Sequence, residues 1–378
     1  MMSIMGGTGG TGGTGGTGGT GGTGGTGGTG GTGGTGGLTI TGLGAFLGAG
    51  ADPVYDSELV LGLQVAEQSI VHVTNKMPPA REARELAFAS AQNMALWADW
   101  VRSSVYLTDF LKDLDWEVNP RRKTVAVRYG QGTFATYQRP AMRTFTRQLE
   151  FMRQYLDQRA DRGPEVITQL GFPTPYFAMI LGLQTCHRFT GELIALTQVL
   201  ASHVAMVVKH QLACRRPVSI GATVMPMIPT PAHGSFPSAH ATEAYSVAEV
   251  LCAFAEEHKS YYTDFARRQA LLRKMAERIA VNRTVAGVHY PIDTWAGAIL
   301  GRAVGQIVLA KCGINGSVDG YAYDAQADKD FFGTEFEKGT NADFGVSRAG
   351  RFRVKPSPVF SWLWGKAANE FDLRNGSA

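Results

Sequence analysis

Three short blocks between Lys209 and Asp293 decide how this chain is interpreted: KHQLACRRP (209–217), SFPSAHATEAYS (235–246) and NRTVAGVHYPID (282–293). The residues of interest in them are three permanent cations (Lys209, Arg216, Arg283), the hydroxyl group of Ser238, the N–H groups of the helix start after it, and two imidazoles (His240, His289), of which His289 has a carboxylate, Asp293, four residues later. A tetrahedral oxyanion needs this kind of inventory: charge neutralisation, directional donors, and a base or nucleophile whose tautomer is fixed. The blocks therefore predict an oxyanion site.

Each block taken alone also has an ordinary structural explanation. Lys209 and Arg216 would share one helix face, but basic residues at a helix end also interact favourably with its dipole. Ser238 can begin a helix whose first N–H groups bind an anion, or it can simply cap that helix. Asp293 could fix the tautomer of His289, although such pairs are usually structural. The coincidence of all three blocks favours the functional explanation.

Helical periodicity dominates the rest of the chain, and strand signals are weak. The segment 116–136, which contains the alternating TVAVRYGQG (124–132), is the one strand candidate, and a short hairpin or a charged loop are both possible there. Helices are expected over 57–73, within 177–214 as one long or two broken helices, and over 240–258, 262–281 and 291–312. The fold is therefore predicted as all-α, a multi-helix bundle with little or no strand.

The chain is expected to divide into three segments. Residues 1–37 are mostly an uninterrupted Gly-Gly-Thr repeat, which can bury no apolar side chain and should be disordered. Residues 38–312 should form the helical domain, with the catalytic segment at about 177–312. Residues 313–378 are rich in Gly, Asp and aromatic residues with little periodicity, so they are predicted to be an irregular extension packed on the domain.

Charge and cysteine content limit the partners and the compartment. A net charge of +4 is too mild to indicate nucleic acid, and the four cysteines lack metal-type pairing, which fits buried free thiols in a reducing compartment. The N-terminus lacks a signal-peptide pattern. The apolar runs 193–208 and 295–312 contain polar residues before reaching the ~20 residues of a membrane span. A cytoplasmic protein without nucleic-acid or membrane partners is expected, and a homodimer stays open.

The blocks resemble the pattern of a superfamily that unites vanadium-dependent haloperoxidases, type 2 phosphatidic acid phosphatases and bacterial class A acid phosphatases. That pattern is Lys-x6-Arg-Pro, then Pro-Ser-Gly-His, then Ser-Arg-x5-His-x3-Asp, and the resemblance covers roughly residues 177–312. There are two departures, because Ala239 replaces the glycine and Asn282 replaces the serine. Alanine would weaken the site only if the backbone there needs a positive φ.

The resemblance implies a role for each residue. His289 would be the nucleophile, or the ligand of vanadium in a bound vanadate, and Asp293 would orient it. His240 would be the acid–base group at the opposite apex. His233 occupies a position that is histidine in bromide-type haloperoxidases and phenylalanine in the chloride type. The residues that would bind the oxygens of vanadate, or of phosphate in the same site, are Lys209, Arg216, Ser238, Ala239 and Arg283.

One site of this kind serves two chemistries, because vanadate stably adopts the trigonal-bipyramidal shape that phosphate reaches only during transfer. From His233 and the missing signal peptide, we predict a vanadate-dependent haloperoxidase that oxidises bromide or iodide with hydrogen peroxide. The alternative is an acid phosphatase that hydrolyses a phosphomonoester through a phosphohistidine. A third hypothesis is a phosphate-binding protein without catalysis, for which Ala239 is the only support.

Overall fold

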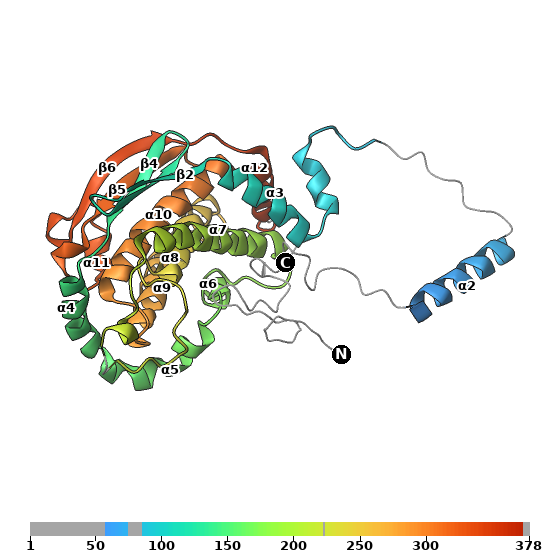
Figure 1. The fold of residues 1–378 in the computed structure, drawn as a ribbon. Coiled ribbons are helices and arrows are strands. Elements are labelled where there is room, and N and C mark those ends of the chain that lie inside the picture. Colours follow the sequence, from blue (N-terminus) through green and yellow to red (C-terminus); the bar gives the residue numbers. More distant parts are fainter. Residues whose placement is uncertain (1–56, 75–84, 222–223, 373–378) are drawn as a thin grey trace.

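The computed structural model describes residues 57–74, 85–221 and 224–372, and the last two ranges form a helical bundle with a sheet along one side (Figure 1). The helices are α2 (Ser57–Thr74), α3 (Asp99–Leu111), α4 (Met142–Arg153), α5 (Arg159–Thr168), α6 (Thr174–Leu181), α7 (Arg188–Leu212), α8 (Ala239–Glu257), α9 (Phe265–Val285), α10 (Pro291–Cys312), α11 (Gly333–Phe336) and α12 (Pro358–Asn369). The strands are β2 (Leu114–Asn119), β3 (Thr124–Tyr129), β4 (Gly132–Gln138), β5 (Ser317–Tyr323) and β6 (Val346–Arg353).

The centre of the bundle is α8, which packs against α7, α9 and α10. Helix α10 is apolar and buried around almost its whole circumference, as expected for a core helix. It approaches α8 closely through glycines: a Cβ on Gly297 would lie 2.5 Å from the carbonyl oxygen of Ser238, and one on Gly301 would lie 2.4 Å from that of Thr242. This close contact holds the start of α8 beside the start of α10, and the Ser238 N–H donates to the Asp293 carbonyl at 2.9 Å.

The five strands form one sheet in the order β2-β3-β4-β5-β6. The pairing of β4 with β5 is parallel, and the other pairs are antiparallel. Helix α10 packs on β4 and β5, where the Tyr137 hydroxyl donates to the Ala296 carbonyl at 2.9 Å. The sheet therefore joins a segment that precedes the three blocks to one that follows them, and it supports the helix that carries Asp293.

The prediction of an all-α fold was wrong. Residues 124–129 do form a strand, and their alternating burial matches the alternation in the sequence. Two further strands, β5 and β6, lie within the segment 313–378, which was expected to be irregular. Each has polar residues and a glycine, so neither is apolar enough to be recognised as a strand from its own sequence. The pairing of β5 with β4, which is distant in the sequence, stabilises the extended conformation.

The helices predicted around the blocks were placed within a few residues. The segment 177–214 is the broken pair, α6 and α7, and Gly182 ends α6 in the left-handed conformation. The Gly-Gly-Thr repeat lies outside the described residues. Three cysteines are buried as expected, whereas Cys186 is exposed, and all four are free thiols.

One helical segment of the described chain is long and apolar enough to cross a membrane, contrary to the expectation that no run would qualify. It extends from Arg188 to Ser219 and includes α7. In this structure 78% of its apolar window is buried inside the protein. Such burial is what a core helix of the bundle requires, and the same length and composition would also suit a membrane span.

Candidate active site

The three blocks meet at one buried site, formed by the ends of four helices. Lys209 lies in the last turn of α7 and Arg283 in the last turn of α9, while Ser238 caps α8 and Asp293 lies in the first turn of α10. Lys209 and Arg283 are each 2% exposed, and His289 is 4% exposed. Lys209 and Asp293 are 84 positions apart in the sequence. The site residues nevertheless lie together, because four helix ends with their unpaired backbone groups meet in one place.

His289 is held by Asp293 across the start of α10. The Asp293 Oδ2 atom accepts hydrogen bonds from His289 Nδ1 at 2.8 Å, from the Tyr290 N–H at 3.1 Å, and from the Ser235 hydroxyl. Tyr290 is the N-cap and Pro291 the first helical residue, so the carboxylate at the third position closes a capping box. Because an ionised carboxylate only accepts, the His289 proton is on Nδ1, and the Nε2 lone pair accepts a hydrogen bond from Arg216 NH1 at 3.0 Å.

Ser235, Asp293 and His289 form a hydrogen-bonded relay, and the electrostatics of this relay keep the imidazole of His289 neutral. Burial, followed by the charges of Arg216 and Lys209, holds the pKa of His289 well below its ordinary value. Burial also raises the pKa of Asp293 to about 6, although the hydrogen bond from Ser235 acts to lower it. This carboxyl group is therefore still mostly ionised at neutral pH. The result is an unprotonated Nε2 atom, as a nucleophile needs.

Two of the cations are anchored by backbone carbonyl groups. The Lys209 Nζ atom donates to the carbonyls of Gly234 and Ser235, both at 2.8 Å. The Arg216 NH1 atom donates to the Val288 carbonyl at 2.8 Å and lies 3.0 Å from His289 Nε2. Burial lowers the pKa of Lys209 and brings that of Arg216 to about 10. Because neutral carbonyls do not cancel these charges, the site favours an anion.

The start of α8 supplies further donors. Ser238 accepts a hydrogen bond from the Ala241 N–H at 3.3 Å and so caps the helix. Within the described chain, the N–H groups of Ala239 and His240 have no hydrogen-bond acceptor, as is usual for the first turn of a helix. Ala239 is not among the residues with positive φ, so its backbone needs no glycine. The replacement of glycine by alanine therefore removes no donor and adds no backbone strain.

The end of α5 covers the other side of the site, and no motif in the sequence pointed to it. The carbonyl oxygen of Gln169 lies 2.8 Å from His240 Nε2 and 3.3 Å from Arg283 NH1. Arg283 NH2 also donates to the Val166 carbonyl at 3.3 Å. Burial, followed by the charge of Arg283, lowers the pKa of His240 to about 3. A carbonyl only accepts, so His240 carries its proton on Nε2.

His233 lies beside the arginine of the first block. Its Nδ1 atom is 3.2 Å from Arg216 NH2, and its carbonyl accepts from Arg216 Nε at 3.0 Å. Burial, followed by the charges of Lys209 and Arg216, lowers the pKa of His233 to about 4. Ser235, which sequence reasoning missed, stands two residues later in the second block, and its hydroxyl group could have been recognised as a candidate from that position.

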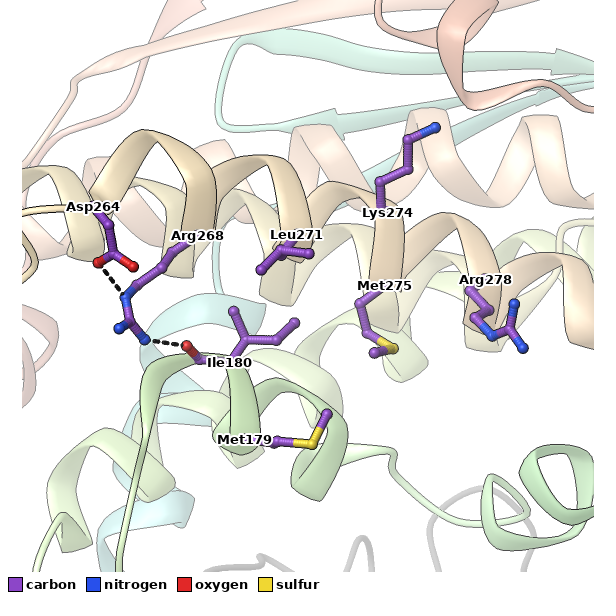
Figure 2. Close-up of a pocket in the computed structure, with 8 residues that line it drawn as sticks. All are labelled: Met179, Ile180, Asp264, Arg268, Leu271, Lys274, Met275 and Arg278. Atoms are coloured by element: carbon purple, nitrogen blue, oxygen red, sulfur yellow. Dashed lines mark hydrogen bonds and ion pairs between the residues drawn. The ribbon is translucent and has the colours of Figure 1, made fainter.

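The donor set suits an oxyanion better than a metal cation. Across residues 57–74, 85–221 and 224–372, there is no group of three or more His, Cys, Asp or Glu side chains placed to hold a metal ion. Phosphate and vanadate both fit the cationic donors described above. A pocket of about 440 Å³ between α6 and α9 is a separate feature, because its lining contains none of the motif residues (Figure 2). Its lining includes Met179, Leu271, Met275 and Arg278.

Anion binding should be accompanied by proton uptake. The free imidazole of His240 is neutral at pH 7, because its pKa is about 3, and a bound dianion beside it would raise that pKa. Titration calorimetry with orthophosphate at pH 6–7, in two buffers of different ionisation enthalpy, should register up to about one proton more uptake by the wild type than by His240→Gln, since the ionisation of orthophosphate itself contributes equally to both. His240→Gln should bind with less uptake. Equal uptake in both proteins would contradict this role of His240.

Comparison with known proteins agrees with this geometry. A family model described as the PAP2 superfamily matches residues 191–313. No curated protein matches the chain. A solved structure described as the first transmembrane PAP2 type phosphatidylglycerolphosphate phosphatase from Bacillus subtilis aligns with 16% identity over 57% of this chain and 86% of its own, with a TM-score of 0.28. A likeness at that TM-score carries no argument about this chain.

The family match covers most of the segment in which the resemblance was recognised, including all three blocks. It favours the phosphatase alternative over the haloperoxidase prediction, for which the comparisons offer no support. Through residues 191–313, the chain therefore matches the PAP2 superfamily.

Proposed function

We propose that this protein is a phosphatase that hydrolyses phosphomonoesters through a phosphohistidine on His289. The observation that carries the proposal is the unprotonated Nε2 atom of His289, held by the Asp293 bond of 2.8 Å and lying 3.0 Å from Arg216. A buried neutral nucleophile surrounded by cations attracts a dianionic phosphoryl group and stabilises the charge that spreads over its oxygens during transfer. Lys209 and Arg283 would complete this cationic cage.

In the first step, His289 Nε2 attacks phosphorus while the bond to the leaving oxygen breaks. His240, which becomes an imidazolium when the dianionic substrate binds, gives its Nε2 proton to that oxygen and returns to the neutral imidazole, so the product leaves as a neutral alcohol. In the structure this proton points to the Gln169 carbonyl, so the leaving oxygen has to compete with that carbonyl for the same donor. The positive charge that develops on His289 is stabilised by Asp293.

In the second step, water attacks the phosphohistidine and the nitrogen–phosphorus bond breaks. The neutral His240 then accepts a proton from the attacking water and becomes an imidazolium again, as it was in the substrate complex. Orthophosphate is released, and His289 Nε2 regains its lone pair. No metal ion is needed for this sequence, since the three cations neutralise the equatorial oxygens.

Vanadate enters this proposal as an inhibitor that imitates the transferring phosphoryl group. The purified protein should hydrolyse p-nitrophenyl phosphate without added metal, and orthovanadate should inhibit competitively. Acid quenching with labelled substrate would destroy a phosphohistidine, so the phosphoenzyme should be trapped by alkaline quenching instead. A parallel assay with vanadate, hydrogen peroxide and bromide should not brominate a dye.

Two outcomes would overturn the proposed activity, and a third would overturn the phosphohistidine. Dye bromination without measurable hydrolysis would restore the haloperoxidase prediction. Tight orthophosphate binding with neither activity would support the hypothesis of a binding protein without catalysis. A protein that hydrolyses the substrate but yields no alkali-stable phosphoenzyme would require a direct attack by water, with His289 acting as a base.

A further inference from the structure

Two hydrogen-bond donors beside the proposed phosphoryl site are buried and have no partner within the described chain. They are Nε2 of Gln169, a residue that is fully buried, and Nε of Arg283, a residue that is 2% exposed. A buried donor without an acceptor costs about 1–3 kcal/mol, so such atoms usually have a partner when the protein works. Both belong to side chains that contact each other, since Arg283 NH2 donates to Gln169 Oε1 at 3.1 Å.

The orientation of the Gln169 amide is fixed by a chain of hydrogen bonds that ends in charged groups. Arg162, which only donates, gives NH1 to the Oδ1 atom of Asn282 at 3.1 Å. The Nδ2 atom of Asn282 then donates to the carboxylate of Glu165 at 3.1 Å and to Gln169 Oε1 at 3.0 Å. With Asn282 and Arg283 both donating to it, Oε1 must be the oxygen, and the free atom Nε2 is an N–H₂ donor.

This network also accounts for the departure at position 282. A serine hydroxyl has a single hydrogen and could not bridge Glu165 and Gln169 while accepting from Arg162. Asparagine has two donor hydrogens and an acceptor oxygen, which are the groups that these contacts use. Asn282 therefore supports Gln169 from outside the oxyanion cage.

Gln169 also stands on the side of the proposed leaving group. Its carbonyl oxygen is 2.8 Å from His240 Nε2, the atom that would protonate the leaving oxygen. The residue follows the last turn of α5, and Arg283 ties that helix end to the end of α9 by donating to the carbonyls of Gln169 and Val166. The Nε2 atom belongs to the same amide as Oε1, so it lies close to the Arg283 guanidinium.

We propose that Gln169 is a further phosphoryl-binding residue, whose Nε2 atom donates to an oxygen of the substrate's phosphoryl group beside Arg283 Nε. This inference rests on the proposed phosphatase function and extends its site beyond the three blocks. The bound oxygen would supply the acceptor that both orphaned donors lack. Phosphate monoesters and free orthophosphate share this chemistry, so orthophosphate is a suitable probe.

Gln169→Leu should weaken orthophosphate binding roughly ten- to hundred-fold, the range for losing a hydrogen bond to a charged group. Titration calorimetry on the full chain measures the affinity, and thermal unfolding checks that the variant is folded. Gln198→Leu is the matched control. Gln198 is also fully buried with an unpartnered Nε2 atom, but its Oε1 accepts from Thr174 and not from a residue of the cage. That variant should bind orthophosphate like the wild type.

A spectroscopic measurement keeps the test decisive if Gln169→Leu does not fold. In the wild type, orthophosphate should shift the side-chain amide signals of Gln169 in a proton–nitrogen correlation spectrum and slow their hydrogen exchange. Unchanged amide signals at saturating orthophosphate, or a folded Gln169→Leu variant with affinity within twofold of wild type, would overturn the inference. If the wild type neither bound orthophosphate nor hydrolysed a phosphomonoester, the proposed function itself would have failed.

Discussion

His289→Ala should lower kcat/KM for a phosphomonoester by about 10⁴-fold or more, because removal of a nucleophile eliminates the covalent route. The imidazole is 4% exposed and neutral, and it is held by Asp293 at 2.8 Å, so no neighbouring side chain of the relay can replace it. Initial rates with p-nitrophenyl phosphate measure the loss. Orthophosphate binding should fall much less, because the three cations remain.

Two further variants make this result specific. Asp293→Asn should keep the shape of the relay but lose the charge that stabilises the imidazolium, with a fall in kcat of roughly 10²–10⁴-fold. His210→Ala replaces an exposed histidine of α7 and should change nothing. Retention of more than a tenth of the wild-type rate by His289→Ala would exclude the phosphohistidine mechanism.

Arg216→Ala should weaken orthovanadate binding by about 3–5 kcal/mol, which is roughly a 10²- to 10³-fold change or more in the dissociation constant. Arg216 is 5% exposed and lies 3.0 Å from His289 Nε2, so its loss leaves a desolvated oxyanion charge without its partner. Arg216→Lys should bind with intermediate affinity, because it keeps the charge but loses the forked donors that also hold Val288.

The neighbouring residue provides the control for this prediction. Arg215 is exposed, so Arg215→Ala removes the same charge from the adjacent position without opening the site. Its effect on the affinity for orthovanadate should be less than threefold, since an exposed charge is screened by solvent. If Arg216→Ala bound orthovanadate as tightly as Arg215→Ala, Arg216 would not belong to the cage.

The oxyanion site could be predicted from the sequence because its chemistry is carried by short-range spacing. Lys209 and Arg216 are seven apart along a helix and its exit, and the His289–Asp293 spacing spans one helix start. Gln169 could not be found in this way. Its contacts with His240 and Arg283 join residues that are 71 and 114 positions apart, and a lone glutamine after a helix carries no signal of its own.

The sheet was missed for a related reason. Strand β5, with the sequence SVDGYAY, contains an aspartate and a glycine, both of which are unfavourable in an isolated strand. Its stability comes from pairing with β4 and β6 and from the cover of α10, and these partners lie far away in the sequence or had been predicted as irregular. Long helices such as α8 and α10 were predicted well, because all their backbone hydrogen bonds are local.

The parallel pairing of β4 with β5 has a consequence for how the protein is made. Ala135 pairs with Tyr321, so a ribosome must synthesise the complete family segment, 191–313, before β4 can meet this partner. Until then α10 has no β5 to pack on, and the carbonyl of Asp330, which accepts from the indole of Trp295 at 2.9 Å, does not yet exist. The helix that carries Asp293 thus gains its full support only late in translation, and the native site forms after nearly the whole chain has emerged.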